Sequence, residues 1–298
     1  YWNSALSQPI GDLVSTRLST QELVQARAVL EASLKLAKQS NPTLYQQLAS
    51  YETNPQLDVW RKDLIWAWNQ ALWDAPSKVL AKDEPDPHLL LTTQLAPDLA
   101  AVNKELILVS AYFVPGETGL VYLTGRSDAG VDVRLLTNSL EATDVPAVHG
   151  GYAPYRKALL EHGVKLFELR RQPGSTSGSG PHLFKTSLSS DSSLHSKAMI
   201  FDQQKSFIGS FNFDPRSGLW NTEVGVLVDS PELAEQARKL ALQGMAPDLS
   251  YEPMLEQGTI VWVTEDNGQL HTLRHEPGNW WRRLNAWFSQ RVGLEKML

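Results

Sequence analysis

Cysteine is absent from the 298 residues of the chain, which excludes disulfide bonds and thiolate metal sites without deciding the cellular compartment. Long apolar runs are also absent. A helix that spans a bilayer needs roughly 20 apolar residues, whereas the run LILVSAYFV at 106–114 has the length of a buried strand. Positive charge is in deficit, and the formal charge of −6 argues against a broad basic face for nucleic acid. A local cationic pocket for one phosphate is still compatible with this balance.

The N-terminal part of the chain, residues 1–79, has mainly helical patterns. A capping box, Ser19 with Glu22, precedes apolar residues at helical spacing, and the Asn-Pro sequence at 41–42 ends this helix. A tryptophan-rich stretch follows, and its later part, up to Pro76, is compatible with a helix or a strand. The chain starts YWNSAL without an initiator methionine or a signal-peptide pattern, so we infer that residue 1 is not the natural start.

From about residue 80 the pattern changes to short apolar runs that alternate with segments of helix length. This alternation predicts an α/β sandwich. The expected strands are 105–113, 131–139, 164–169, 194–201, 205–210 and 222–228, and the expected helices are 94–103, 117–128, 151–161 and 231–243. We therefore expect a helical segment, 1–79, followed by an α/β domain, 80–298.

The chemistry of the chain centres on His195 and Lys197, in the sequence LHSKAMIFD. Side chains alternate along a strand, so these two point to the same face, about 6.6 Å apart. A neutral imidazole with a pKa of about 6.5 is a suitable nucleophile near neutral pH. An ammonium beside it stabilises the oxyanions of a phosphoryl group. The pair therefore indicates nucleophilic chemistry at phosphorus, with an incidental surface pair as the alternative.

Four further residues are candidates for the same site. Ser210 and Asn212 lie two positions apart and supply neutral donors for phosphate oxygens, with turn formation as the alternative role. Glu223 begins another strand and would accept from one imidazole nitrogen, fixing the tautomer of His195; a solvated edge-strand carboxylate is the alternative. Asp202 completes the catalytic candidates, although we expect it to hold the turn after the strand rather than to contact substrate.

These residues together resemble a known signature. His-x-Lys-x4-Asp at 195–202, Gly-Ser-x-Asn at 209–212 and Asn-x-Glu at 221–223 are similar to the motifs of the phospholipase D superfamily. The upstream sequences SAYFVPG, GVDVRLLTNS and AVHGGYAPY resemble the second half of bacterial cardiolipin synthases. The resemblance implies the phospholipase D-type α-β-α sandwich, duplicated so that one motif from each half meets at a pseudo-twofold axis. It further implies a phosphohistidine on one histidine, a proton from the other, and neither metal nor cofactor.

The sequence carries one such motif, because none of the other histidines is followed by lysine at the required spacing. We therefore expect the chain to be the C-terminal half of a two-motif enzyme, inactive or nearly so by itself. The alternative is a homodimer that pairs two copies of the motif across its axis.

Two segments are candidates for contact with lipid. His149 and Tyr152 are candidates for the mouth of a substrate channel, with helix capping by the histidine as the alternative. The segment 279–298 places Trp281 and Leu284 on one helical stripe with arginines elsewhere, a pattern typical of interfacial membrane anchors. Packing of the stripe against the core of the protein is the alternative. On this basis we expect a protein that is peripheral at the inner, cytoplasmic membrane or is cytoplasmic.

The predicted function is transfer of a phosphatidyl group, through a phosphohistidine, to the hydroxyl of a second lipid headgroup. The predicted partners are phospholipid substrates, a membrane surface and the missing half or a homodimer partner, without nucleic acid. One alternative is a phospholipase D that hydrolyses phosphodiesters, which acceptor preference distinguishes. Another is a catalytically silent membrane-docking or interaction module, which forms no histidine adduct.

Overall fold

A computed structural model describes residue 7 and residues 19–40, 42, 64–171 and 194–284, and the chain divides into two units, 1–66 and 67–298. In the first unit, helix α2 (Thr20–Ser40) begins at the predicted capping box. The hydroxyl and the backbone amide of Ser19 both donate to Glu22 Oε2, at 2.8 and 2.7 Å. The described range of the helix ends at Ser40, and Pro42 of the expected stop is helical as well. The start of the helix therefore follows from local sequence.

The second unit is built on a mixed sheet, whose described strands lie in the order β1-β7-β6-β5-β2-β3-β4-β8-β9-β10. Strands β2, β3 and β4 run parallel, and the other neighbouring pairs are antiparallel. Parallel neighbours need a crossover, which helices supply from β2 to β3 and from β3 to β4. The strands are β1 (Trp68–Trp73), β2 (Glu105–Ser110), β3 (Asp132–Asn138), β4 (Lys165–Leu169), β5 (Lys197–Phe201), β6 (Lys205–Gly209), β7 (Val224–Asp229), β8 (Ser250–Glu256), β9 (Thr259–Asp266) and β10 (Gln269–Leu273).

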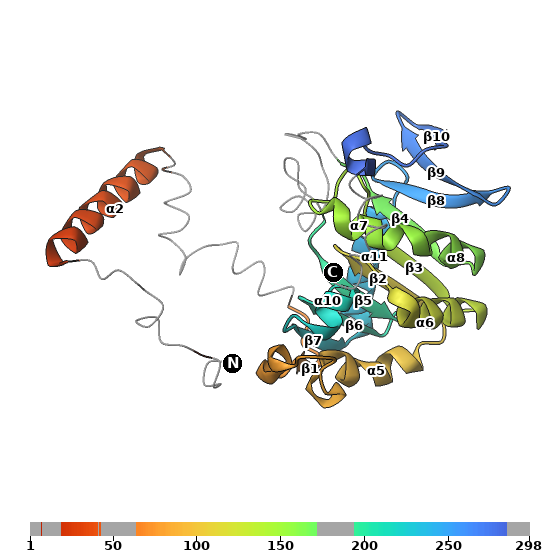
Figure 1. Cartoon of the computed structure of the whole chain (residues 1–298), viewed down its shortest axis with the longest axis horizontal. Coiled ribbons are helices and arrows are strands. Elements are labelled where there is room, and N and C mark those ends of the chain that lie inside the picture. Colours follow the sequence, from red (N-terminus) through yellow and green to blue (C-terminus); the bar gives the residue numbers. More distant parts are fainter. Residues whose placement is uncertain (1–6, 8–18, 41, 43–63, 172–193, 285–298) are drawn as a thin grey trace. The chain divides into compact units, whose positions relative to one another are not determined.

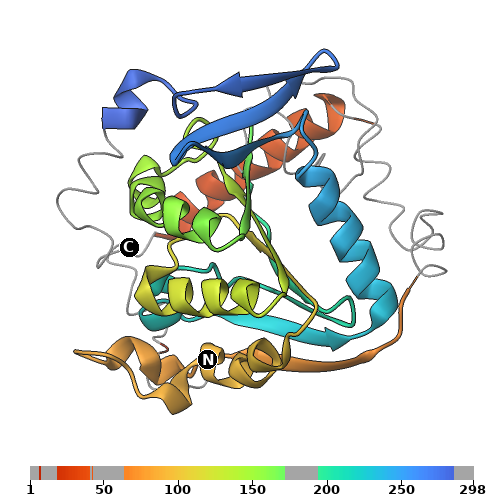
Figure 2. The ribbon, with the colours of Figure 1, turned by 90° about the vertical axis from the view of Figure 1, so that its right-hand side faces the viewer.

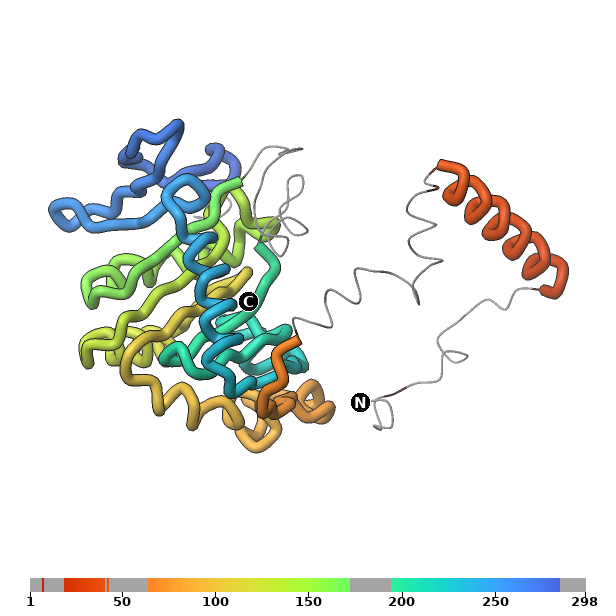
Figure 3. Tube along the Cα trace, turned by 180° about the vertical axis from the view of Figure 1, so that it is seen from behind, coloured from red at the N-terminus to blue at the C-terminus, as the bar shows by residue number. Residues whose placement is uncertain are grey.

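Helices cover both faces of this sheet (Figure 1). They are α5 (Leu91–Ala101), α6 (Gly116–Asp128), α7 (Pro146–Tyr152), α8 (Arg156–Glu161), α10 (Pro215–Leu219) and α11 (Pro231–Gly244), with short 3-10 turns η2 (Pro76–Leu80), η3 (Pro87–Leu89) and η4 (Ala153–Tyr155). Figure 2 shows α6 and α8 on one side of the sheet and α11 on the other, and Figure 3 shows α11 from behind, in front of the strands.

Strand β2 lies at the centre of the three layers, and all of its residues are buried. Leu106 and Leu108 pack in one core with Leu123 of α6, whereas Ile107 between them packs in a second core with Ala234 of α11. Alternate residues of a strand point to opposite faces, so a continuous apolar run is required where both faces are covered. The arrangement confirms the predicted α/β sandwich.

The boundaries differ from the prediction in two places near the motifs. The strand expected at 194–201 is β5 (Lys197–Phe201), so His195 precedes the strand instead of lying within it. The helix expected at 151–161 is divided among α7, η4 and α8. Pro154 lies at the division, because a proline lacks the N–H and fits only the first turn of a helix.

Two other parts of the second unit were left open or were not predicted. The tryptophan-rich stretch ends in a strand, β1, which pairs with β7 and lies within the range 1–79. Strands β8 to β10 were not predicted, although their turns carry a hairpin signal. Asn267 and Gly268 both have positive φ, 52° and 77°, as a two-residue hairpin turn requires.

Candidate active site

Lys197 is the first residue of β5 and pairs with Ser110 at the end of β2, whereas His195 lies two residues before the strand. His195 is exposed, and its carbonyl accepts a 2.7 Å hydrogen bond from Lys197 Nζ. The amine is therefore held beside the backbone of the histidine. Among residues 64–171 and 194–284, the imidazole itself has no hydrogen-bond partner, so its orientation by Glu223 stays a prediction.

Three acidic residues from different parts of the chain act on Lys197. Partial burial lowers the pKa of Lys197 below its usual value, and the charges of Glu223, Asp144 and Asp214 oppose that shift. Asp144 lies before α7, Asp214 is the N-cap of α10, and Glu223 precedes β7. Three separate elements therefore converge on one amine.

Ser210 and Glu223 contact each other across β6 and β7. Glu223 is 6% exposed and accepts a hydrogen bond from the Ser210 hydroxyl, whose oxygen accepts from Val224 N at 3.1 Å. Gly209 allows this contact, because a Cβ there would lie 2.4 Å from Val224 O and 2.6 Å from Gly225 Cα. The glycine of the Gly-Ser-x-Asn motif thus lets β6 approach β7 closely enough for the serine to reach the carboxylate.

Asn212 is held through its amide oxygen. Its Oδ1 accepts from the backbone amide of Tyr112 at 3.3 Å, and because an N–H requires an acceptor, the NH₂ group faces the other way. Asn212 is 8% exposed, and its NH₂ group has no partner within the part of the chain that the structure describes. It is therefore available to a substrate oxygen.

Tyr112 and Asp144 form a pair at the same site that sequence reasoning missed. The Tyr112 hydroxyl donates to the Asp144 carboxylate, with 2.9 Å to each oxygen. Partial burial, together with this hydrogen bond and the charge of Asp144, raises the pKa of Tyr112 to about 12. The hydroxyl therefore stays protonated near neutral pH. Its sequence signal was its place in SAYFVPG, a stretch to which we assigned no residue role.

A buried ion pair between Asp74 and Lys78 holds the elements that carry the site, and the sequence did not predict it. Asp74 and Lys78 are 1% and 0% exposed in their side chains and lie 2.8 Å apart. Lys78 Nζ also donates to Ser217 O at 2.9 Å, and Asp74 Oδ2 accepts from Glu223 N at 2.7 Å. Asp74 Oδ1 accepts from Leu91 N at 2.6 Å. One buried pair therefore fixes the starts of β7 and α5 and the α10 turn.

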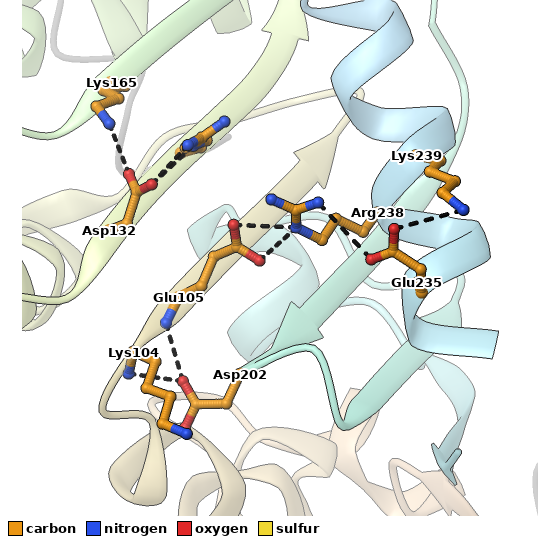
Figure 4. Close-up of polar contacts among 9 residues, drawn as sticks. Lys104, Glu105, Asp132, Lys165, Asp202, Glu235, Arg238 and Lys239 are labelled. Carbon is orange, nitrogen blue, oxygen red and sulfur yellow. Dashed lines mark hydrogen bonds and ion pairs between the residues drawn. The ribbon is translucent and has the colours of Figure 1, made fainter. Parts of the chain in front are cut away.

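Asp202 lies at the far end of β5, five residues from Lys197, or roughly 16 Å along an extended strand. Its carboxylate accepts from the backbone amides of Lys104 and Glu105 at 2.7 and 2.9 Å (Figure 4). It also accepts from the amide of Asn103 at 3.0 Å, and its φ is 51°. This placement agrees with the turn role we expected and separates Asp202 from the other candidates.

His149 and Tyr152 are buried in α7, in a charged network next to the site. His149 Nε2 lies 2.6 Å from Glu276 Oε1, and Arg156 contacts both His149 and Glu276. Burial would raise the pKa of Glu276, but the charge of Arg156 and the contact with His149 hold it well below its usual value. Both predicted channel residues line a cavity of about 10 Å³ with Tyr112. That volume is about one water, and the channel role stays a prediction.

The same network contains a group of potential metal ligands. Among the described residues, His149, Glu168 and Glu276 place ligand atoms within 4.8 Å of one another. The guanidinium of Arg156 contacts all three, 3.2 Å from the His149 ring and 3.5 Å from Glu168 Oε1. Since this cation already supplies positive charge to the cluster, the residues fit an internal ion-pair network better than a metal site.

The described start of the C-terminal segment exposes two tryptophans. Trp280 and Trp281 are 62% and 58% exposed, and their rings stack with centroids 4.0 Å apart. Arg282 ties this turn to the domain by donating to Leu140 O and Thr143 O. The rest of the predicted stripe, in 285–298, lies outside the described residues. No helix among the described residues has both the length and the apolar character needed to cross a membrane.

The candidates thus fall into two groups. Strands β5, β6 and β7 are neighbours, and their register brings Lys197, Ser210 and Glu223 to one end of the sheet, beside Asn212. An amine, a hydroxyl, an amide and a carboxylate lie there, and the amine is hydrogen-bonded to the carbonyl of the exposed His195. Such a set can hold a tetrahedral anion while a ring nitrogen attacks its centre. Asp202 at the other end of β5, and the buried His149 and Tyr152 of α7, lie outside this group.

Known proteins match the chain across this site. Residues 96–243 match the family model described as "Cardiolipin synthase, PLD-like domain". Cardiolipin synthase C of Escherichia coli K12 is 36% identical over 237 residues, which are 79% of this chain and 49% of that protein. Cardiolipin synthase B of the same organism is 28% identical over 60% of this chain and 38% of its own length. The chain therefore spans half the length of these relatives or less.

Among solved structures, a phospholipase D family member, Nuc from Salmonella typhimurium, has a TM-score of 0.46 and 15% identity, covering 64% of this chain and 100% of that chain. The family-model match over 96–243 includes the His-x-Lys motif and the Gly-Ser-x-Asn turn. The chain therefore belongs to the phospholipase D superfamily of enzymes and is cardiolipin synthase-like.

Proposed function

We propose that the chain is the C-terminal catalytic half of a phospholipase D-type phosphatidyltransferase. The observation that carries this proposal is the convergence of Lys197, Ser210, Asn212 and Glu223 beside an exposed His195 at one end of the sheet. The match to cardiolipin synthases supports a phosphatidyl donor and a lipid hydroxyl as acceptor. It leaves the identity of both lipids to experiment.

The proposed reaction has two steps. In the first, a histidine nitrogen bonds to the phosphorus of the donor, the P–O bond to the leaving alcohol breaks, and a second histidine gives that oxygen a proton. In the second step, the second histidine takes the proton of the acceptor hydroxyl, whose oxygen bonds to phosphorus as the P–N bond breaks. His195 has one of these roles, and the histidine of the other half has the other.

The remaining residues act on charge and orientation. Lys197 and the NH₂ group of Asn212 hold the non-bridging oxygens, where negative charge develops in the transition state. The Ser210 hydroxyl donates a hydrogen bond to Glu223 and assists in binding the phosphate. Glu223 orients the His195 ring, and the buried pair of Asp74 and Lys78 fixes Glu223 in turn through its backbone amide.

A second half is needed because one histidine cannot act as nucleophile and as acid in the same step. We propose that it comes from sequence upstream in a longer polypeptide, in keeping with a relative of which the matched region is 49%. A second copy of the chain is the other source. Transfer by the 298-residue chain, measured over a range of chain concentrations, separates the two. No transfer at any concentration supports the upstream half, and activity that rises steeply with concentration supports pairing of copies.

The mechanism is tested by quenching the assembled enzyme during turnover of a donor labelled in its phosphorus. A P–N adduct on His195 assigns it as the nucleophile, and an adduct on the histidine of the second half assigns His195 as the acid. Absence of an adduct on both contradicts the covalent mechanism and favours the silent module. The ratio of lipid product to free phosphatidic acid decides between a transferase and a hydrolase. Hydrolysis is the alternative because His195 is exposed to water.

We also propose that the domain docks on a membrane surface through the exposed pair Trp280 and Trp281. Indole rings with nearby arginines are favoured at the interface between water and lipid. The backbone contacts of Arg282 would hold this pair at a fixed position on the domain. Such docking would make the protein peripheral and bring the site to its lipid substrates.

A further inference from the structure

A cavity of about 560 Å³ opens between helices α5, α6 and α10. This volume lies in the range of small-molecule pockets, about 300–1,000 Å³. Its walls are mainly apolar, with Leu95 and Leu99 from α5, Tyr122 from α6, Leu219 from α10 and the aromatic rings of Phe211 and Phe213.

The lining suits an uncharged hydrocarbon. Its charged members are Glu117, Arg126 and Asp214. Glu117 is exposed, Arg126 donates to Val102 O at 3.1 Å, and Asp214 accepts from Ser217 N at 2.7 Å as the cap of α10. Arg126, the one cation among the lining residues, therefore already has a carbonyl partner, and the carboxylate of Asp214 would repel an anion. A free carboxylic acid or a phosphate is disfavoured in the interior, whereas alkyl groups fit the leucine, alanine and phenylalanine side chains.

The cavity lies on the same face of the sheet as the phosphate site. Lys197 and Met199 are two positions apart on β5, so they point to the same face of the sheet, about 6.6 Å apart. Met199 lines the cavity, which places the cavity on the same face as the amine. The loop around Asn212 forms another wall through Phe211 and Phe213, and Phe213 N donates to Ser110 Oγ at 2.9 Å.

We infer that this cavity holds one acyl chain of the phosphatidyl substrate while its phosphate lies at Lys197. The inference rests on the proposed function, because it assumes that a diacyl lipid is the ligand of the site. Each buried methylene raises affinity by about fourfold. Affinity for soluble short-chain phosphatidylglycerols should therefore rise about fourfold per added carbon until the cavity is filled.

Ala96 and Ala101 of α5 offer a matched pair of variants. Both are exposed alanines on one helix, so a tryptophan at either position does not disturb the core. Ala96 lines the cavity and Ala101 does not. The probe is phosphatidylglycerol with a diazirine at the end of one acyl chain, mixed into phosphatidylcholine vesicles and photolysed with the 298-residue chain.

The expected adducts fall in 90–101, 114–126 and 211–219, at least about tenfold weaker in Ala96→Trp and unchanged in Ala101→Trp. Adducts outside these three ranges, or equal labelling of both variants, would overturn the inference. Labelling is repeated with His195→Ala, because binding needs no chemistry. If adducts form in the cavity but the assembled enzyme transfers no phosphatidyl group, the proposed function is wrong and the acyl site is supported. If the enzyme transfers the group but no adducts form in the cavity, the acyl site is wrong and the proposed function is supported.

Discussion

Replacement of Lys78 by methionine tests the buried pair on which the site rests. The change leaves Asp74 charged at a position where both side chains are almost fully buried, 0% and 1% exposed. Removing one partner of a buried ion pair costs about 3–5 kcal/mol. Asp74 keeps two amide donors, Leu91 N and Glu223 N, which offset part of this cost. We therefore expect the lower end, about 3 kcal/mol.

The assay is urea unfolding of the chain, followed by tryptophan fluorescence. With a slope of about 2 kcal/mol per molar urea, the midpoint should fall by about 1.5 M. Lys82→Met is the control, because Lys82 is exposed and close in sequence. A loss below about 1 kcal/mol in Lys78→Met would refute the reasoning.

Three further predictions concern charge, packing and membrane contact. Burial raises the pKa of Asp214 from 3.8 to about 6, so its contribution to stability is present below about pH 4 and is lost as the pH rises to about 6. Between these two pH values, the free energy of unfolding in urea should change by about 3 kcal/mol less in Asp214→Asn than in the original chain. Gly209→Ala forces two strands apart and should cost about 1–3 kcal/mol, whereas Gly218→Ala, which meets nothing within 4 Å and lies in α10, should leave the unfolding midpoint unchanged or raise it slightly. Replacing Trp280 and Trp281 by alanine should weaken vesicle sedimentation about tenfold or more; unchanged binding would contradict a docking role.

The fold was predictable where its signals are local. Strands β2 to β7 were expected from short apolar runs, and α2 was expected from its capping box, because these patterns depend on neighbours in sequence. Strand β1 was not decided, since its place at the edge beside β7 depends on a partner about 150 residues away. The break at Pro154 was predictable from proline chemistry, and the expected single helix overlooked it.

The site was predictable only as far as its motif extends. Spacing, together with the resemblance to a family signature, selected His195, Lys197, Asp202, Ser210, Asn212 and Glu223 as one group, and the structure places Asp202 apart from the others. Tyr112 and Asp144 meet through the fold, 32 residues apart, and Lys78 reaches the carbonyl of Ser217 across 139 residues. Such contacts carry no periodic signal in sequence. The signal available for Asp74 and Lys78 was a spacing of four, and that spacing usually marks a solvated pair.

Phosphatidyl transfer by the assembled enzyme, compared between His195→Ala and Ser196→Ala, tests the central claim most directly. Both residues are exposed and adjacent, so neither change should alter the unfolding midpoint. The account predicts that His195→Ala lowers the transfer rate by about 10²–10⁴-fold while Ser196→Ala stays near the original rate. Transfer by His195→Ala at the original rate, with the fold intact, would contradict it.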